Sequence, residues 1–374
     1  MLLSACMMVS TVQGQEMFGI SNSNFSGNMG MGLNPSLFVG SPYHHEWNII
    51  SLDAFFDNDY IYVENDAQLL RKLVRGKPVD SEDFKDYYDG EPKNGYSSVF
   101  VRGPSYIRNG EKFSWGVHTA LRSVASAKDF PVDVLKFFKE DLDYAPQQNV
   151  NFNGGDYESV SLVWAELGGT IGKKILEKRR MGDMDELIAA VTLKFLAGFE
   201  SAFIKVNELD YSVPSGDMIM VNNLNGEYGH AVDDGETDGT DFEDPFKVRG
   251  IGGGMDIGIT YYKGKIPGAG DCNETAEIRK KYKYRLGVSV IDIGMINFNK
   301  ETRTFGYNDE SANFQGLDSL NFNTIFDIDS LISQTFYGDP RAARTDDRYK
   351  AFLPSSLSVQ FDYCIRPSVY VNAT

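Results

Sequence analysis

The feature that most constrains this chain is a residue-by-residue alternation between apolar and small or polar side chains. In the segment 113–122, Phe113, Trp115 and Val117 would share one face of a strand, and Ser114 and Gly116 would lie on the other. A period of two is typical of β-strands with one apolar face. The pattern is clear in 50–56, 113–122, 187–204, 255–262 and 357–366, and further strands are expected at 97–106, 158–175, 217–222, 284–298 and 302–307.

Two of these segments change phase, which predicts β-bulges. In 284–298 the alternation shifts at Ile291, and in 158–175 it shifts after Trp164. One extra residue in a strand produces such a shift. The sequence therefore predicts an all-β protein of about ten or eleven recognisable strands.

The faces opposite the apolar ones distinguish a soluble sandwich from a membrane barrel. A sandwich would turn a face rich in Lys, Glu and Thr towards water. Here the second face is rich in Gly, Ala and Ser with sparse charges of both signs, as in the lumen of a barrel, and the apolar face carries the large aliphatic and aromatic side chains of a lipid-facing belt. The pattern favours an antiparallel transmembrane β-barrel of about 10–14 strands, incomplete in this chain, with short helices in its loops and an N-terminal plug.

Net charge and hydropathy exclude two classes of protein. The formal net charge is −17, so a nucleic-acid partner is not expected, because phosphate binding needs a positive surface. No apolar run reaches the ~18–20 residues that a membrane helix needs, whereas a barrel strand needs only ~9–11. We expect a protein of the bacterial outer membrane that contacts its lipid.

The N-terminal region divides into three predicted parts. Residues 1–14 resemble a truncated signal peptide, because they are apolar with small residues but no Lys or Arg precedes Arg71. Residues 15–45 are predicted to be a plug, with a turn at Asn34, Pro35 and Ser36; the alternative is a disordered tail. Residues 46–374 would form the barrel, whose sheet we expect to be unclosed.

Three connections are predicted to hold short helices, at 66–76, 131–141 and 327–337. Residues 225–246 are predicted to form an acidic loop. Its Asp spacing resembles a calcium loop, but the twelfth position is Pro245 where a Glu is needed, so no metal site is predicted. The mature part holds Cys272 and Cys364, and their pairing stays open.

Motifs for catalysis or cofactor binding were not found. The segment 168–174 lacks the first Gly and the Ser or Thr of a phosphate-binding loop, and the four histidines show no metal-ligand spacing. We expect neither an enzyme nor a cofactor.

Whole strand patterns then carry a resemblance to a known family. The segments 23–63, 103–126, 282–298 and 353–374, among them "GMGLNPSLFVG" and "LPSSLSVQFDYCIRPSVYVNAT", resemble an uncharacterised family of Bacteroidota outer-membrane β-barrel proteins. That family is similar to the fatty-acid-transporter type of plugged barrel, which carries an Asn-Pro-Ala turn in its plug, where this chain has Ser36 in place of Ala. The resemblance implies a plugged barrel but establishes no activity.

Two sets of residues follow from the predicted faces. The outer surface should expose Trp115, Val117, Phe195, Phe199, Ile257, Ile259, Val359 and Phe361. The lumen, where a ligand would bind, should hold His118, Arg122, Lys194, Glu200, Asp256, Arg285, Asp362 and Arg366. Charges at lipid-facing positions cost ~2–4 kcal/mol near the membrane midplane, so these side chains should point inward.

Two functions stay open at this point. One is a plugged channel for small hydrophobic or amphiphilic molecules. The other is a structural or assembly component of the outer membrane, an anchor or a partner of envelope proteins, without transport activity. A continuous apolar pocket beside the plug would favour the first, and a filled lumen would favour the second.

Overall fold

The structure of the protein is a computed structural model, which describes residues 21, 26–39, 44–63, 72, 75, 84–110, 113–180, 183–232, 246–265, 282–316, 324–366 and 369–374. The strands are β1 (His45–Asn48), β2 (Ser51–Asn58), β3 (Ile61–Val63), β4 (Phe84–Asp86), β5 (Lys93–Asn109), β6 (Phe113–Phe130), β7 (Asn151–Arg180), β8 (Asp183–Ser215), β9 (Met218–Ala231), β10 (Gly250–Lys265), β11 (Tyr284–Phe298), β12 (Thr302–Gln315), β13 (Arg344–Asp346), β14 (Tyr349–Phe352), β15 (Ser356–Arg366) and β16 (Val369–Ala373). The helices are α1 (Gly27–Gly30), α3 (Val132–Glu140) and α4 (Ile325–Tyr337), with a 3₁₀ turn at Ala145–Gln147.

One large antiparallel sheet dominates the molecule, which confirms the predicted all-β class. In the described part of the chain it has 14 strands, with the main order β1-β5-β6-β7-β8-β10-β11-β15-β16. Strand β2 also pairs with β5, β14 pairs with β11, and β9 joins β8 to β12. Among these residues no pairing joins β1 or β2 to β16, so the sheet is open and does not close into a barrel.

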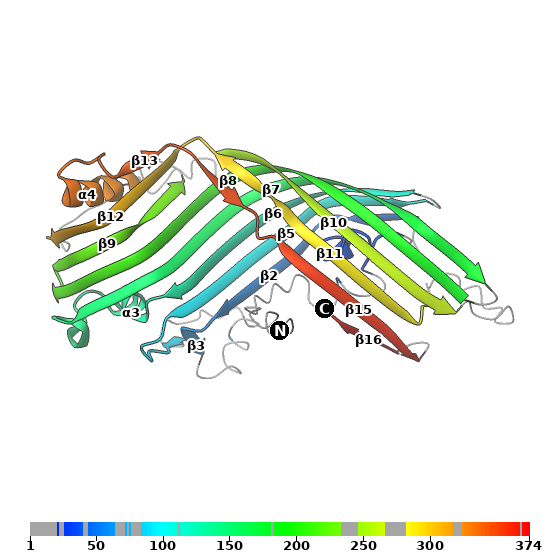
Figure 1. Ribbon diagram of the computed structural model, residues 1–374, viewed down its shortest axis with the longest axis horizontal. Helices are drawn as coiled ribbons and strands as arrows, with labels where there is room; N and C mark the ends of the chain where they lie inside the picture. The colour runs from blue at the N-terminus through cyan, green and yellow to red at the C-terminus, as the bar shows by residue number, and fades with distance from the viewer. Residues whose placement is uncertain are drawn as a thin grey trace, which may run out of the picture.

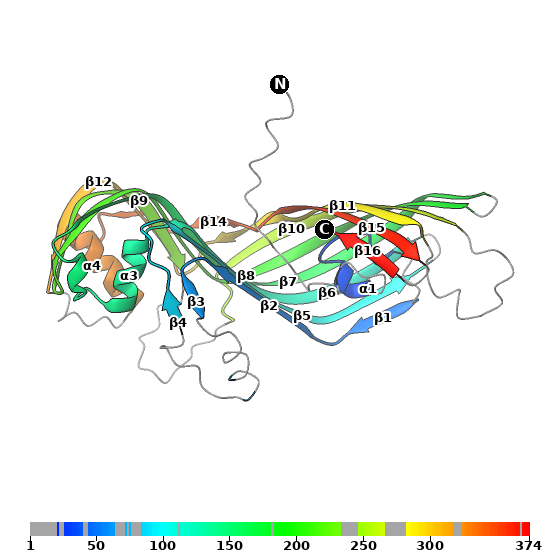
Figure 2. The ribbon, with the colours of Figure 1, turned by 90° about the horizontal axis from the view of Figure 1, so that it is seen from below.

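The sheet curves in two opposite directions along its length (Figures 1 and 2). At one end it wraps around α1, and we call this half the cradle. At the other end it bends over α3 and α4, and we call this half, with β9, β12 and β13, the arch. Strands β7 and β8, with 30 and 33 residues, run through both halves and make them continuous.

The outer face of the cradle exposes apolar side chains, as the alternation predicts. Seven of the eight predicted positions are exposed: Trp115, Val117, Phe195, Ile257, Ile259, Val359 and Phe361. The prediction is wrong for Phe199, which is only 7% exposed. The register slips by one residue at Phe199, between the pairs Val163–Glu200 and Trp164–Gly198, and the ring of Phe246 lies 5.5 Å away.

The same slip corrects the expected bulge after Trp164. Strand β7 keeps its alternation through this region, and Leu162, Trp164 and Glu166 are all buried on one face. The extra residue belongs to the partner strand β8. Trp164 is completely buried in the core where cradle and arch meet, together with Leu196, Ile296 and Phe298.

The short helices lie in connections between strands. The predicted helix at 131–141 corresponds to α3, and the one at 327–337 corresponds to α4, whose N-terminus has a capping box between Thr324 and Asp327. The predicted helix at 66–76 lies outside the described residues, apart from two isolated positions. Among the described helices, none is long and apolar enough to cross a membrane.

The prediction of a loop over 225–246 is wrong for its first part. Residues up to Ala231 belong to β9, which pairs with both β8 and β12. Pairing on both sides stabilises this Gly- and Asn-containing segment as a strand despite its low strand propensity. Residues 233–245, with the whole segment that resembles a calcium loop, lie outside the described residues.

Candidate functional site

The N-terminal segment 26–39 lies inside the cradle against the concave face of the sheet (Figure 2). It begins with the single helical turn α1 and continues as a series of turns. Met31, Phe38 and Val39 are buried in a hydrophobic cluster that includes Ile107 and Ile188 of the sheet. Burial of these apolar side chains accounts for the low charge of the segment, because an unpaired charge would be costly there.

The turn at Asn34, Pro35 and Ser36 is the best-anchored part of this segment. The Asn34 side chain accepts hydrogen bonds from the Ser36 backbone N–H at 2.9 Å and from the Ser36 hydroxyl at 2.7 Å. Its amide group donates to Gln360 Oε1 at 2.8 Å, and the Ser36 hydroxyl lies 2.6 Å from Thr260 Oγ1. Asn34 and Ser36 are completely buried. The turn therefore connects the segment to β10 and β15.

A second group of hydrogen bonds holds the other end of the segment. Asn28 donates to Ser105 Oγ at 2.7 Å, and Arg102 donates to the Asn28 backbone oxygen at 2.7 Å. In between, Ser289 donates to the Leu33 backbone oxygen at 2.7 Å. The segment thus spans the concave face from β5 to β15 and links strands near both edges of the open sheet.

Glycines of the sheet make room for this close approach. A Cβ atom at Gly258 would lie 2.0 Å from Asn34 Oδ1, and one at Gly172 would lie 2.3 Å from Val39 Cγ2. At such distances something must shift, so a larger residue at either position would force Asn34 or Val39 of the segment to move. These glycines explain why the inward faces of β7 and β10 are rich in small residues.

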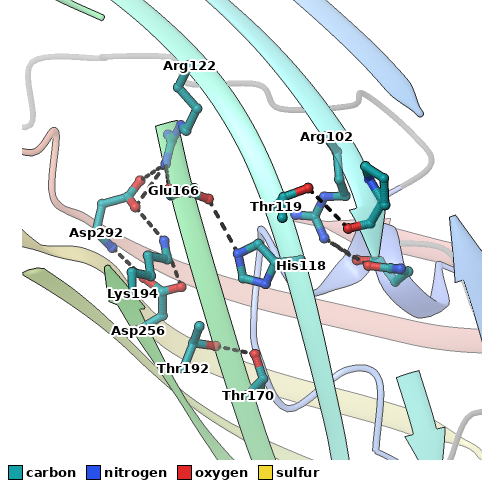
Figure 3. Close-up of polar contacts among 12 residues, drawn as sticks. Arg102, His118, Thr119, Arg122, Glu166, Thr170, Thr192, Lys194, Asp256 and Asp292 are labelled. Atoms are coloured by element: carbon teal, nitrogen blue, oxygen red, sulfur yellow. Dashed lines mark hydrogen bonds and ion pairs between the residues drawn. The ribbon is translucent and has the colours of Figure 1, made fainter. Parts of the chain in front are cut away.

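A cluster of buried charged side chains lies on the same concave face (Figure 3). We call it the ionic cluster, and it consists of His118, Arg122, Glu166, Lys194, Asp256 and Asp292. Arg122 donates to both oxygens of Asp292, at 2.9 and 2.8 Å. Lys194 lies 2.8 Å from Asp256 and 2.7 Å from Asp292, and His118 lies 3.4 Å from Glu166. The cluster joins five neighbouring strands, from β6 to β11.

Asp292 occupies the centre of the cluster because of a β-bulge. The register between β10 and β11 shifts between Met255 and Ile257, and Asp292 has a left-handed backbone with φ 58°. Its backbone N–H donates to Asp256 Oδ1 at 2.8 Å. Asp and Asn tolerate this conformation better than other non-glycine residues. The bulge turns the carboxylate inward, where Arg122 and Lys194 meet it.

The ionic cluster borders a small cavity beside Met31 and Gly32 of the N-terminal segment. The cavity has a volume of about 10 Å³, roughly the space of one water molecule. Three cations, Arg102, Arg122 and Lys194, face three carboxylates, which are Glu166, Asp256 and Asp292. Among the described residues, His118 Nδ1 and Glu166 Oε2 have no hydrogen-bond partner, so a water molecule here would satisfy buried polar atoms.

The structure brings together four of the eight residues predicted for the lumen. His118, Arg122, Lys194 and Asp256 belong to the ionic cluster, and all are buried. Arg285 and Asp362 form a separate buried pair at 3.3 Å, to which the Tyr282 hydroxyl donates at 2.5 Å.

The other two predicted residues do not join these groups. Glu200 is half-buried and pairs in register with Val163, beyond the slip at Phe199. Because of this slip, Glu200 lies on the opposite face of the sheet from Lys194. Arg366 ends β15, and its side chain lies outside the described part of the chain.

Sequence reasoning missed Glu166 and Asp292. The phase shift at Ile291 was a usable signal for Asp292, since a bulge redirects the residue beside it. Glu166 was hidden by the wrong assignment of a bulge to β7. With β7 kept in phase, Glu166 falls on the same face as Trp164 and Gly168.

Metal and thiol chemistry receive no support from the described residues. Among them no group of three or more His, Cys, Asp or Glu side chains is placed to hold a metal ion. Cys364 lies half-buried on β15, and Cys272 lies outside the described residues, so their pairing is not described.

The protein is therefore of the all-β class, with an open antiparallel sheet whose concave face holds a buried N-terminal segment and an ionic cluster. Residues 35–374 match the model of a family of unknown function, DUF5723, and the chain belongs to that family. Neither a curated protein nor a solved structure matches the chain.

Proposed function

We propose that this chain is a protein of the bacterial outer membrane whose open sheet is built like the wall of a β-barrel, with the cradle in the lipid and the arch outside it. The observation that carries the proposal is the contrast between the two faces of the cradle. Large apolar side chains such as Leu193, Phe195, Leu167 and Ile251 are exposed on the outer face, and charged groups are buried on the inner face. In water this arrangement would be unfavourable, whereas lipid requires it.

The length of the apolar face matches the thickness of a membrane. On β10 it extends from Ile251 to Tyr261, and on the neighbouring β8 from Leu187 to Ala197. About 11 residues at a rise of ~3.3 Å cover ~36 Å along a strand, or ~25–28 Å across a membrane at a tilt of ~40–45°. A barrel in the outer membrane has an apolar band ~25 Å tall.

Tryptophan fluorescence in brominated lipid tests this placement. Trp47 and Trp115 are 77% and 42% exposed, and Trp164 is completely buried. In variants that keep one tryptophan each, with Phe at the other two positions, brominated lipid should quench Trp47 and Trp115 and leave Trp164 unquenched. Equal quenching of all three, or quenching of Trp164 alone, would contradict a lipid-facing outer surface.

We further propose that segment 26–39 is a plug and that its displacement opens a path for small amphiphilic molecules. The resemblance to the fatty-acid-transporter type of barrel supports this idea. The contacts of the segment support it as well. In the described residues the segment is held by hydrogen bonds and apolar contacts and not by strand pairing. These contacts can be broken while the sheet stays intact.

A disulfide lock tests the channel. Ser36 Oγ and Thr260 Oγ1 are 2.6 Å apart, so a S36C/T260C pair in a background with Cys6, Cys272 and Cys364 replaced by Ser is close enough to oxidise. In liposomes, entry of a labelled alkyl sulfonate, which crosses bare lipid slowly, should occur after reduction and stop after oxidation. S36C alone is the control and should respond to neither treatment.

The size of the cavity favours a second candidate, a structural or assembly component of the outer membrane. A space for about one water molecule and a balanced set of charges mean that the interior is filled where the ionic cluster meets segment 26–39. If the reduced and oxidised S36C/T260C variants admit the sulfonate equally slowly, at the rate of protein-free liposomes, the channel is excluded and this second function stands.

A further inference from the structure

We propose that the end of the cradle opposite the arch binds the phosphate groups of anionic lipid through Arg108, Lys173 and Lys283. We call these three residues the basic rim. The inference rests on the proposed membrane location and adds a specific lipid partner to it.

The basic rim lies where β5, β6 and β11 end. Arg108 is the last but one residue of β5, and Lys283 directly precedes β11. Lys173 on β7 pairs in register with Phe113, the first residue of β6. All three side chains are exposed. Arg108 and Lys283 therefore border the apolar outer face at the ends of their strands, and Lys173 lies within its margin, with the exposed Ile175 beyond it on β7.

In the described part of the chain the charges of the basic rim are uncompensated, although the whole chain has a net charge of −17. Among the described residues, no carboxylate pairs with Arg108, Lys173 or Lys283 within 4 Å.

Three exposed cations of the arch differ in this respect. Lys128 lies 3.7 Å from Asp129, and Arg348 lies 3.8 Å from Asp346. Lys205 is placed in register between Glu158 and Glu227. These three cations of the arch thus have acidic neighbours, whereas Arg108, Lys173 and Lys283 have no carboxylate within 4 Å in the part of the chain that the structure describes.

Each cation of the basic rim stands beside an aromatic side chain. Lys173 lies over the ring of Phe113 at 5.0 Å, and Lys283 lies over the ring of Tyr363 at 5.4 Å. Arg108 is opposite Trp115, whose ring is 5.5 Å from that of Tyr106. Aromatic rings concentrate at the level of the head groups, so a cation held beside a ring is at the right depth to meet a phosphate.

The distances between the three cations indicate that they bind several lipid molecules and do not form a single pocket. Arg108 is two strands from Lys173, and Lys173 is three strands from Lys283. In register, Arg108 is level with Ile171, two residues from Lys173, and Lys173 is level with Val288, five residues from Lys283. At ~4.8 Å per strand and ~3.3 Å per residue, the separations are ~12 and ~22 Å. The sites are continuous with the apolar outer face, so a molecule that binds here must have both acyl chains and an anionic head group. An anionic phospholipid has both.

Lipid retention measures the proposed binding. The full chain is reconstituted in vesicles of phosphatidylcholine and phosphatidylglycerol in equal amounts, extracted gently, and the lipids that remain bound are counted by native mass spectrometry. The variant R108Q/K173Q/K283Q is compared with K128Q/K205Q/R348Q, which removes three exposed cations of the arch and changes the net charge equally.

We expect the unmodified chain and the arch variant to retain phosphatidylglycerol in preference to phosphatidylcholine by about five-fold or more, since a cation near anionic lipid contributes that much. The rim variant should lose this preference. Equal retention of the two lipids by the unmodified chain, or equal loss in both variants, would overturn the proposal. Failure to insert into either vesicle would instead count against the proposed membrane location.

Discussion

The side-chain amide of Asn34 donates a hydrogen bond to Gln360 Oε1 at 2.8 Å, although 326 positions separate the two residues in the chain. Gln360 is itself completely buried and donates to Ser358 Oγ at 2.6 Å. The N-terminal segment can make this contact only after β15 has joined the sheet. Docking of the segment therefore requires that the concave face of the cradle is complete.

Replacing Asn34 with Ala should lower the free energy of unfolding by about 1–3 kcal/mol, because Gln360 Oε1 and the Ser36 N–H would be buried without partners. Urea titration of the protein in detergent micelles measures the change. Asn207 is exposed and donates a single hydrogen bond to Asn225, so N207A serves as the control and should change stability by less than about 0.5 kcal/mol. An N34A protein as stable as the control would show that the turn does not contribute.

The glycine contacts give a sharper test of how the segment is held. A Cβ at Gly258 would meet Asn34 and Pro35, whereas a Cβ at Gly169 would have nothing within 4 Å. G258A should displace the segment and make a cysteine at position 36 reactive towards a water-soluble maleimide. G169A, on the outer face, should leave that cysteine protected. Equal protection in both variants would mean that the segment tolerates the extra atom.

The alternation in the sequence predicted the strands well because it is imposed by burial on one face. Phe195 and Ile257 follow it without interruption. Phe199 does not, because the slip that buries it depends on the pairing of β8 with β7, and its cover depends on Phe246 from a distant segment. Neither partner is visible in a local pattern. The continuation of β9 to Ala231 was missed for the same reason, since pairing on both sides stabilises it.

The candidate site was predictable only in part. His118, Arg122, Lys194 and Asp256 alternate with outward apolar residues, so their inward direction could be read from the sequence. Their assembly into one cluster could not, because it requires Glu166 from β7 and the bulge that turns Asp292 inward. The turn at Asn34 was recognised, but its partners Thr260 and Gln360 were not, since they lie more than 200 positions away.

Asp292 allows a test of the ionic cluster with little effect on the backbone. Asn tolerates the left-handed conformation as Asp does, so D292N removes the charge and keeps the bulge. Arg122 and Lys194 would then lack their shared carboxylate, and we expect a loss of about 3–5 kcal/mol in the free energy of unfolding. Asp309 has a similar φ of 56° but is exposed, so D309N should change stability by less than about 0.5 kcal/mol. Similar urea midpoints for the two variants would contradict a stabilising role for the cluster.

In the arch, Asp86 ties α3 to the short strand β4. Lys136 of α3 donates to Asp86 Oδ2 at 2.8 Å, and Lys139 donates to the other oxygen. Burial alone would raise the pKa of Asp86, but the hydrogen bonds from the two lysines outweigh it and lower the pKa to about 2. In the unfolded chain the pKa of an Asp is about 3.9.

The attachment of α3 should therefore weaken at low pH. Because the pKa of Asp86 is lower in the folded state, its contribution to stability is fully present above pH ~4 and disappears as the pH falls towards about 2. Hydrogen exchange of the α3 amides, measured by mass spectrometry with correction for intrinsic rates, should be faster relative to those rates at pH 2.5 than at pH 5. D86N removes the titrating group, so its α3 amides should exchange faster than those of the unmodified protein at pH 5, and this difference should shrink at pH 2.5. A difference between the two proteins that stays constant over this range would show that Asp86 does not hold α3 through its charge.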